Sequence, residues 1–196
     1  MSIHLTFYRL VVTLGVILVG MSIPTVPWAD VPLRAVIIVR HGEKATAPLE
    51  DPPLSPAGQA RAQALLETLR DAGLTAILTT QQLRTRETGA PLVTGLHLQS
   101  IVVPTSPDPR EHARAVAAAV RQAGGTVLVI DHQLTIPLII AALGGPSVRI
   151  MCDVEFSNLY LLMPADATRM ELLRMHYGAL DPPHGEGCHI SPVSPP

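Results

Sequence analysis

The stretch "VIIVRHGEKA", residues 36–45, places an apolar run directly before a cluster of ionisable side chains. Residues 36–39 are all β-branched, and such a run is typical of a strand that is buried on both faces of a sheet. The run ends at Arg40 and His41. Because ionisable side chains are costly to bury, we expect this cluster at the carboxyl end of the strand, where a loop begins.

Strand-like and helix-like segments alternate through the rest of the chain. Short apolar runs predict strands at 34–40, 75–80, 98–104, 126–131, 154–163 and 170–178. Helical spacing of apolar residues predicts helices at 55–73, 83–95, 108–125 and 134–145. Strands joined through helices lie parallel, whereas the short turn "PADATR" joins the last two strands as a hairpin. The predicted fold class is α/β: a three-layer α/β/α fold with a mostly parallel central sheet and an antiparallel edge hairpin.

The first two predicted helices contain residues that mark helix boundaries. Ser55 is a typical N-cap, Pro56 fits the first helical position, and Gly73 fits the stop. Arg61 is assigned to the solvated face of this helix. In the second helix, Pro91 is expected to interrupt or end the helix, because proline lacks the N–H donor that a helix interior needs.

Composition and charge fit a single globular domain. The chain has 196 residues, of which 47% are hydrophobic and 15% are charged. The net charge is −2 and no long basic run occurs, so nucleic acid is not expected as a partner. We divide the chain into an N-terminal segment (1–30), one domain (31–180) and a Pro/Gly-rich tail (181–196).

The N-terminal segment has the features of an export signal. Arg9 precedes an apolar run of 14 residues, which is short for a membrane span. The sequence leaves open whether this segment is a cleaved signal peptide or an uncleaved anchor that tethers the protein to a membrane. Both predict a periplasmic or secreted protein. In such an oxidising compartment Cys152 and Cys188 could form one disulfide, and two unpaired thiols are the alternative.

Three predicted strand ends carry arginine or histidine. Arg40 and His41 follow the first strand, Arg84 follows the second, and His132 follows the run "TVLVID". In open α/β sheets, ligands bind outside the carboxyl ends of the strands. Two guanidinium groups and two imidazoles suit a tetrahedral dianion, because arginine offers planar bidentate donors to phosphate oxygens. The sequence therefore predicts a phosphate pocket at this edge of the sheet.

Four segments, in this order, resemble the landmarks of the histidine phosphatase superfamily, which has the phosphoglycerate mutase-like fold. They are "RHGEK" (40–44), "LSPAGQARAQAL" (54–65), "LRTRETGAPL" (83–92) and "VLVIDHQLTIPLIIAALGG" (127–145). The resemblance covers about residues 34 to 178. It implies that His41 is a nucleophile that becomes phosphorylated, and that Arg40, Arg84 and His132 complete the pocket. The compact length resembles the short phosphatase branch, which includes phosphohistidine phosphatases.

The implied reaction runs in two steps, phosphoryl transfer to His41 and then to water. His41 must be neutral at its attacking nitrogen, and a backbone carbonyl near Gly42 could hold the other ring N–H. This chemistry implies no cofactor and no metal. The tail segment "HGEGCHI" (184–190) contains ligand-type residues, but their spacing makes no familiar metal site.

The general acid that would protonate the leaving oxygen is left open. Asp108 and Glu111 lie in the segment where many family members carry this carboxylate, yet "DPRE" also fits an N-cap, a first-turn proline and a capping box. Asp131, directly before His132, could be an acid or could tune that histidine. Asp51 over the pocket mouth is a further candidate.

The leading hypothesis is an exported phosphatase that hydrolyses a phosphomonoester or another labile phosphoryl group, on a phosphorylated small molecule or a phosphoprotein. A phosphoglycerate mutase-like phosphotransferase is less favoured, because the short chain leaves few residues to hold and reorient an intermediate. A non-catalytic phospholigand-binding module is the other alternative, and the intact His41 counts against it. Lys44 could extend the positive field toward a second substrate group, or could be an ordinary loop charge.

Overall fold

The computed structural model describes residues 31–182 and contains one six-stranded sheet. The strands are β1 (Leu33–Arg40), β2 (Leu74–Thr79), β3 (Ser100–Val102), β4 (Gly125–Asp131), β5 (Asn158–Pro164) and β6 (Met170–His176). Their order across the sheet is β3-β2-β4-β1-β5-β6. The first four strands are parallel, and β5 and β6 form an antiparallel hairpin at one edge. The predicted sheet is confirmed.

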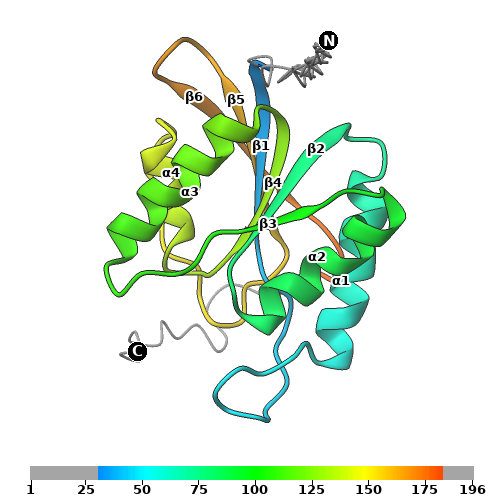
Figure 1. Cartoon of the computed structure of the whole chain (residues 1–196). Helices are drawn as coiled ribbons and strands as arrows, with labels where there is room; N and C mark the ends of the chain where they lie inside the picture. The colour runs from blue at the N-terminus through cyan, green and yellow to red at the C-terminus, as the bar shows by residue number, and fades with distance from the viewer. Residues whose placement is uncertain (1–30, 183–196) are drawn as a thin grey trace, which may run out of the picture.

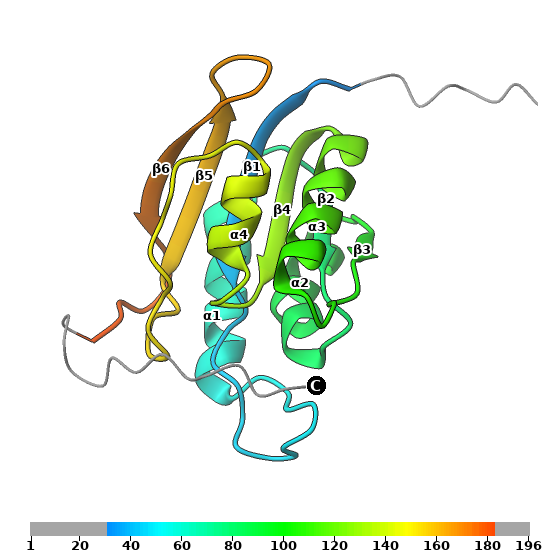
Figure 2. The same ribbon diagram turned by 90° about the vertical axis from the view of Figure 1, so that its left-hand side faces the viewer.

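Four helices cover the two faces of this sheet. They are α1 (Pro56–Leu69), α2 (Leu83–Gly95), α3 (Pro109–Ala123) and α4 (Ile136–Ala142). Helices α3 and α4 pack on one face, and α1 and α2 pack on the other (Figures 1 and 2). The three-layer α/β/α architecture predicted from the sequence is therefore confirmed.

Strand β1 shows why its sequence is apolar at every position. Val36 and Ile38 belong to the core beneath α3 and α4, whereas Ile37 and Val39 belong to the core beneath α1 and α2. Successive side chains of a strand point to opposite faces, so a central strand between two helical layers buries both sets. Burial continues past the apolar run, because Arg40 and His41 at the carboxyl edge of the sheet are only 7% and 5% exposed.

Several element boundaries differ from the predicted ones. Helix α2 continues through Pro91, because Leu92 remains fully buried against the sheet and its packing outweighs the missing N–H donor. Strand β3 has only three residues. Residues 154–157 lie before β5 rather than in it, and the carbonyl group of Glu155 accepts a hydrogen bond from the side chain of Arg40.

Arg61 is the other correction, since it is buried at 5% exposure rather than solvated. Its guanidinium forms an ion pair with Glu43, at 2.7 Å between NH2 and Oε1, and its NH1 donates to the carbonyl of Tyr177. A buried arginine is tolerated when its charge and donors are satisfied in this way. Helix α1 is thereby connected to the loop that follows β1.

Two predictions cannot be compared with this structure. The export signal at 1–30 and the cysteine at 188 lie outside the described residues, so both the export and the Cys152–Cys188 bridge stay predictions. Within residues 31–182, no helix combines the length and the apolar character that a membrane crossing requires.

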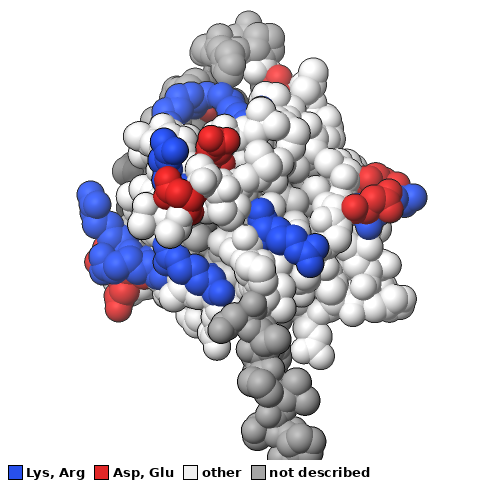
Figure 3. Space-filling model, turned by 90° about the horizontal axis from the view of Figure 1, so that it is seen from above, with Lys and Arg blue, Asp and Glu red and all other residues white. Residues whose placement is uncertain are grey.

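At the end of the molecule where the parallel strands begin, charged side chains of both signs form small groups separated by uncharged surface (Figure 3).

Candidate active site

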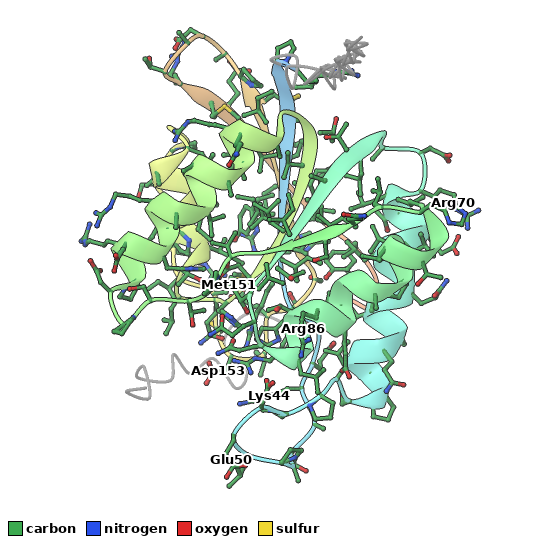
Figure 4. The ribbon with its side chains drawn as sticks, in the orientation of Figure 1. Lys44, Glu50, Arg70, Arg86, Met151 and Asp153 are labelled. Carbon is green, nitrogen blue, oxygen red and sulfur yellow. The ribbon has the colours of Figure 1, made fainter. Side chains whose placement is uncertain are left out.

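The loops at the carboxyl ends of β1, β2 and β4 bring together the four predicted pocket residues: Arg40, His41, Arg84 and His132. The ring centroids of His41 and His132 lie 5.2 Å apart, and Nε of Arg84 lies 3.3 Å from Nε2 of His41. Lys44 and Asp153 lie at the same end of the molecule, below the strands (Figure 4). Lys44 is exposed, on a loop that pairs with Leu54.

The ring of His41 is fixed by a contact at each nitrogen. Its Nδ1 lies 2.7 Å from the carbonyl oxygen of Gly42, which can only accept, so Nδ1 carries the proton. Its Nε2 then carries a lone pair, which faces the Nε–H donor of Arg84. The loop therefore presents a neutral imidazole whose unprotonated nitrogen points toward the guanidinium.

Arg40 is held in place through one end of its guanidinium group, while its Nε–H has no partner. Its NH1 lies 3.0 Å from the carbonyl oxygens of Cys152, Asp153 and Glu155, and its guanidinium lies 4.0 Å from the ring centroid of Phe156. Its Nε–H is buried and has no hydrogen-bond partner. A buried donor without a partner is rare and costly, and here it identifies a group that could donate to an anion.

His132 and Arg84 are held by polar groups of the loop after β2. Nε2 of His132 lies 3.2 Å from the hydroxyl of Thr80, and that hydroxyl lies 3.0 Å from the hydroxyl of Thr85. NH2 of Arg84 donates to the side-chain oxygen of Gln82. Thr85, near the start of α2, thus connects the end of β2 to α2.

Close backbone packing holds the loop after β1 in place. A Cβ on Gly42 would lie 2.9 Å from the carbonyl oxygen of Gly58, and a Cβ on Gly58 would lie 2.2 Å from that of Glu43. Only glycine allows such an approach. The N–H of Gly42 donates to the hydroxyl of Thr88, so α1 and α2 both fix the position of His41.

The environment of the pocket keeps both histidines neutral. Burial lowers the pKa of His41 well below its ordinary value, and the neighbouring His132 and Arg40 lower it further. Burial likewise lowers the pKa of His132 to about 4, although the adjacent Asp131 opposes the shift. Burial also lowers the pKa of Arg40, to about 10, which leaves that guanidinium charged at neutral pH.

The model of the histidine phosphatase superfamily (branch 1) matches residues 36–111, which include the nucleophile-type histidine and Arg84 of this pocket. Over these residues the chain is similar to the histidine phosphatase superfamily. No curated protein sequence matches the chain. Three solved structures share its fold at low sequence identity.

The first of these structures is a protein histidine phosphatase, SixA, complexed with tungstate. It is 19% identical, with a TM-score of 0.56, over 72% of this chain and 96% of the other. A mycobacterial glucosyl-3-phosphoglycerate phosphatase is 15% identical, with a TM-score of 0.55, over 74% and 99% of the two chains. YhfR from Bacillus stearothermophilus is 20% identical, with a TM-score of 0.53, over 69% and 93%.

Asp108 and Glu111, the first candidates for a general acid, are both engaged at the start of α3. The carboxylate of Asp108 accepts from the N–H of Arg110 as an N-cap. Glu111 accepts from the hydroxyl of Ser106, which in turn accepts from the N–H of Asp108. The predicted capping box is therefore relayed through Ser106. Neither carboxylate makes a hydrogen bond or ion pair with the four pocket residues.

The other two candidates for the general acid, Asp131 and Asp51, lie next to pocket residues, but their carboxylates already accept hydrogen bonds from other groups. Asp131 is 1% exposed and pairs with His112, whose ring Nε2 lies 2.9 Å from Oδ2. Hydrogen bonding from His112 lowers the pKa of Asp131 despite complete burial, so Asp131 is a carboxylate rather than a proton donor. Asp51 accepts from the N–H of Leu83, and its Oδ1 lies 3.8 Å from NH1 of Arg84.

Sequence reasoning missed the loop that precedes β5. Its carbonyl groups and Phe156 hold Arg40, but the segment was expected to be strand because "VEFSNLYLLM" is apolar. The side chain of Asp153 accepts from Gln133, the residue after His132, at 2.6 Å.

The described residues hold no group of three His, Cys, Asp or Glu side chains placed to bind a metal ion.

Acid pH should destabilise the protein through His132. Its pKa is about 4 in the folded protein and 6.5 ordinarily, so the unfolded chain binds the proton first as the pH falls. We expect this histidine to reduce the free energy of unfolding progressively between those two pH values. The measurement is the difference in Tm between the wild type and H132Q, which should shift in favour of H132Q on acidification. A constant difference across this range would show that folded His132 titrates normally.

Proposed function

We propose that this protein is a phosphatase that hydrolyses a labile phosphoryl group through a phosphohistidine intermediate on His41. The observation that carries the proposal is the state of the His41 ring. Its Nδ1–H is held by Gly42, its Nε2 lone pair faces Arg84, and the pKa of the imidazole lies well below neutrality. A neutral, oriented nitrogen beside two guanidinium groups is what nucleophilic attack on a phosphate dianion requires.

In the first step, Nε2 of His41 forms a bond to phosphorus as the bond from phosphorus to the leaving group breaks. In the second step, water attacks phosphorus, the P–N bond breaks and inorganic phosphate departs. The unpartnered Nε–H of Arg40 and the guanidinium of Arg84 donate to the equatorial oxygens, where negative charge accumulates. His132 supplies a further ring nitrogen at this site.

The carboxylates narrow the class of substrate. Asp108 and Glu111 cap α3, Asp131 is buried in an ion pair, and Asp51 caps α2 beside Arg84. A basic alkoxide needs a proton in the transition state, whereas a phenolate or a protonated imidazole departs without one. We therefore favour aryl, acyl or phosphohistidine-type substrates over alkyl phosphates. The likeness to a protein histidine phosphatase supports this choice.

A mutase and a binding module remain less favoured. Apart from the two longer connections at 41–55 and 143–157, the strands and helices are joined by short loops, which leaves few residues to retain and reorient a released intermediate. A binding module needs the arginines but does not need a neutral imidazole with a lone pair on Nε2, because that lone pair repels a phosphate oxygen. The geometry of His41 therefore favours catalysis.

The experiment compares an aryl phosphate with an alkyl phosphate for the wild type and two amide variants. D108N and E111Q preserve the caps, so we expect each to leave kcat/KM for both esters unchanged. A working general acid would contribute roughly 10²- to 10⁴-fold for the alkyl ester alone. The account predicts a large preference of the wild type for the aryl ester.

D51N is the decisive third variant, because Asp51 lies beside the pocket. We expect it to affect both esters alike, through its contacts with Leu83 and Arg84. A selective loss of alkyl ester hydrolysis in D51N, D108N or E111Q would identify an acid and contradict the proposed substrate class. Absence of hydrolysis of both esters by the wild type would contradict the proposed function itself.

A further inference from the structure

Behind the pocket lies a buried pair, His112 on α3 and Asp131 at the end of β4. The two side chains are 1% and 2% exposed, and Nε2 of His112 lies 2.9 Å from Oδ2 of Asp131. The other ring nitrogen, Nδ1, lies 3.0 Å from the carbonyl oxygen of Pro104. The reaction described above uses neither residue.

Both ring nitrogens of His112 face oxygen atoms. The carbonyl of Pro104 can only accept, so Nδ1 must carry a proton. Oδ1 of Asp131 accepts from the N–H of His132, at 2.8 Å, and from the hydroxyl of Thr135, while Oδ2 faces His112. A carboxylate with three donors around it is satisfied in its ionised form, which places the second proton on Nε2. His112 is then an imidazolium.

Asp131 contacts the backbone of both pocket histidines. Its carbonyl oxygen accepts from the N–H of His41 at 3.0 Å, and its side chain accepts from the N–H of His132. In the sheet, Asp131 pairs with Arg40. One residue is thus connected to three of the four pocket residues, and its carboxylate is held from behind by a helix that contributes nothing to the pocket itself.

We propose that His112 and Asp131 form a positioning pair for catalysis, in which the His112 imidazolium fixes the Asp131 carboxylate and Asp131 fixes the backbone that carries His41 and His132. The inference rests on the proposed function for its kinetic readout. Its structural part, an imidazolium bridging Pro104 and Asp131, stands independently of the reaction.

The pair has a predictable pH range. Asp131 is the charged group that faces His112, and His132 lies on the other side of that carboxylate. Burial lowers the pKa of His112, but the hydrogen bond that His112 donates to Asp131 outweighs it and raises that pKa, whereas the pKa of Asp131 is lowered. The contribution of His112 is therefore complete below its unfolded pKa of 6.5 and is lost as the pH rises through its higher folded pKa.

The first measurement is heteronuclear NMR of the imidazole nitrogens in the full chain. We expect both nitrogens of His112 to be protonated at neutral pH in the wild type. In D131N, the new amide can donate to Nε2, so His112 should become neutral with the proton on Nδ1 alone. An unprotonated Nε2 in the wild type would place the proton on Asp131 and overturn the proposal.

The second measurement is kinetic, with an aryl phosphate as substrate. H112A leaves the Asp131 carboxylate without its partner, and we expect kcat to fall roughly 10- to 100-fold with little change in KM, as for a misplaced catalytic group. V116A is the matched control, because Val116 is buried one turn further along α3 and has no polar contact with the site. It should lower Tm and leave kcat unchanged.

The outcomes separate this inference from the proposed function. If H112A folds and retains the wild-type kcat, the pair does not position the pocket. If H112A does not fold, D131N provides the test. In the wild type, kcat should decline at alkaline pH as His112 loses its second proton, whereas in D131N His112 is already neutral and this decline should be absent. If the wild type has no phosphatase activity, the proposed function fails. The pair is then tested by adding inorganic phosphate to the wild type and to H112A and following the NMR signals of the His132 ring. We expect phosphate to shift these signals less in H112A, and equal shifts in the two proteins would overturn the proposal.

Discussion

Replacing His41 by alanine is expected to abolish turnover of an aryl phosphate, with a loss of at least about 10⁴-fold in kcat. The variant removes the imidazole whose Nδ1 is held by Gly42 and whose Nε2 faces Arg84, and no other imidazole of the pocket has that orientation. An aryl leaving group needs little protonation, so the loss cannot be attributed to a missing acid. The measurement is steady-state hydrolysis at neutral pH.

H97N is the matched control for this variant. His97 is an exposed histidine after α2 with a positive φ of 54°, a conformation that asparagine adopts readily. We expect H97N to retain wild-type turnover. Wild-type turnover in H41A would remove His41 from the mechanism and leave its geometry without a function.

The second large effect is expected when either pocket arginine is changed to lysine. R84K keeps a positive charge but loses the Nε–H that faces Nε2 of His41, and R40K loses both the unpartnered Nε–H and the anchor to the loop before β5. Lysine cannot reproduce the planar fork of arginine. We expect each variant to lose about 10²-fold or more in kcat/KM, comparable to removal of one preorganised donor.

R86K is the control on the same helix, because Arg86 is an exposed residue of α2 two positions beyond Arg84. It should behave as the wild type. Unchanged kinetics in R84K would show that the guanidinium serves only to hold Gln82 and Asp51, and would leave Arg40 as the single arginine of the pocket.

The sequence was sufficient for the sheet and for the four pocket residues, for a physical reason. A strand buried on both faces must be apolar at every position, so β1 and β4 stand out, and the first ionisable residue after each marks the carboxyl edge. Arg40, His41 and His132 were found in this way. Ser55 as the N-cap of α1 follows from equally local chemistry, and its side chain accepts from Gly58.

Two buried ion pairs could not be predicted, because their partners are brought together only by the folded chain. Arg61 and Glu43 come from α1 and the loop after β1, and His112 and Asp131 come from α3 and β4. Taken singly, an arginine or an aspartate in a sequence is more often solvated than buried. The same limit left the general acid open, since a carboxylate at a helix start fits a cap and an acid equally well.

The loop before β5 shows a different limit. Its sequence is apolar enough for a strand, yet its carbonyl groups turn toward Arg40. Hydrogen bonds from a buried guanidinium outweigh strand propensity there, and nothing local in the sequence records that demand. The pocket therefore includes backbone that no residue pattern could assign to it.

The central claim is that His41 carries the phosphoryl group during turnover. The direct test is to mix the wild type with labelled aryl phosphate, stop the reaction without acid and locate the label by mass spectrometry of the peptides. We expect an acid-labile, alkali-stable adduct on His41 that disappears as substrate is consumed. Continued turnover with no adduct, or an adduct on another residue, would contradict the account.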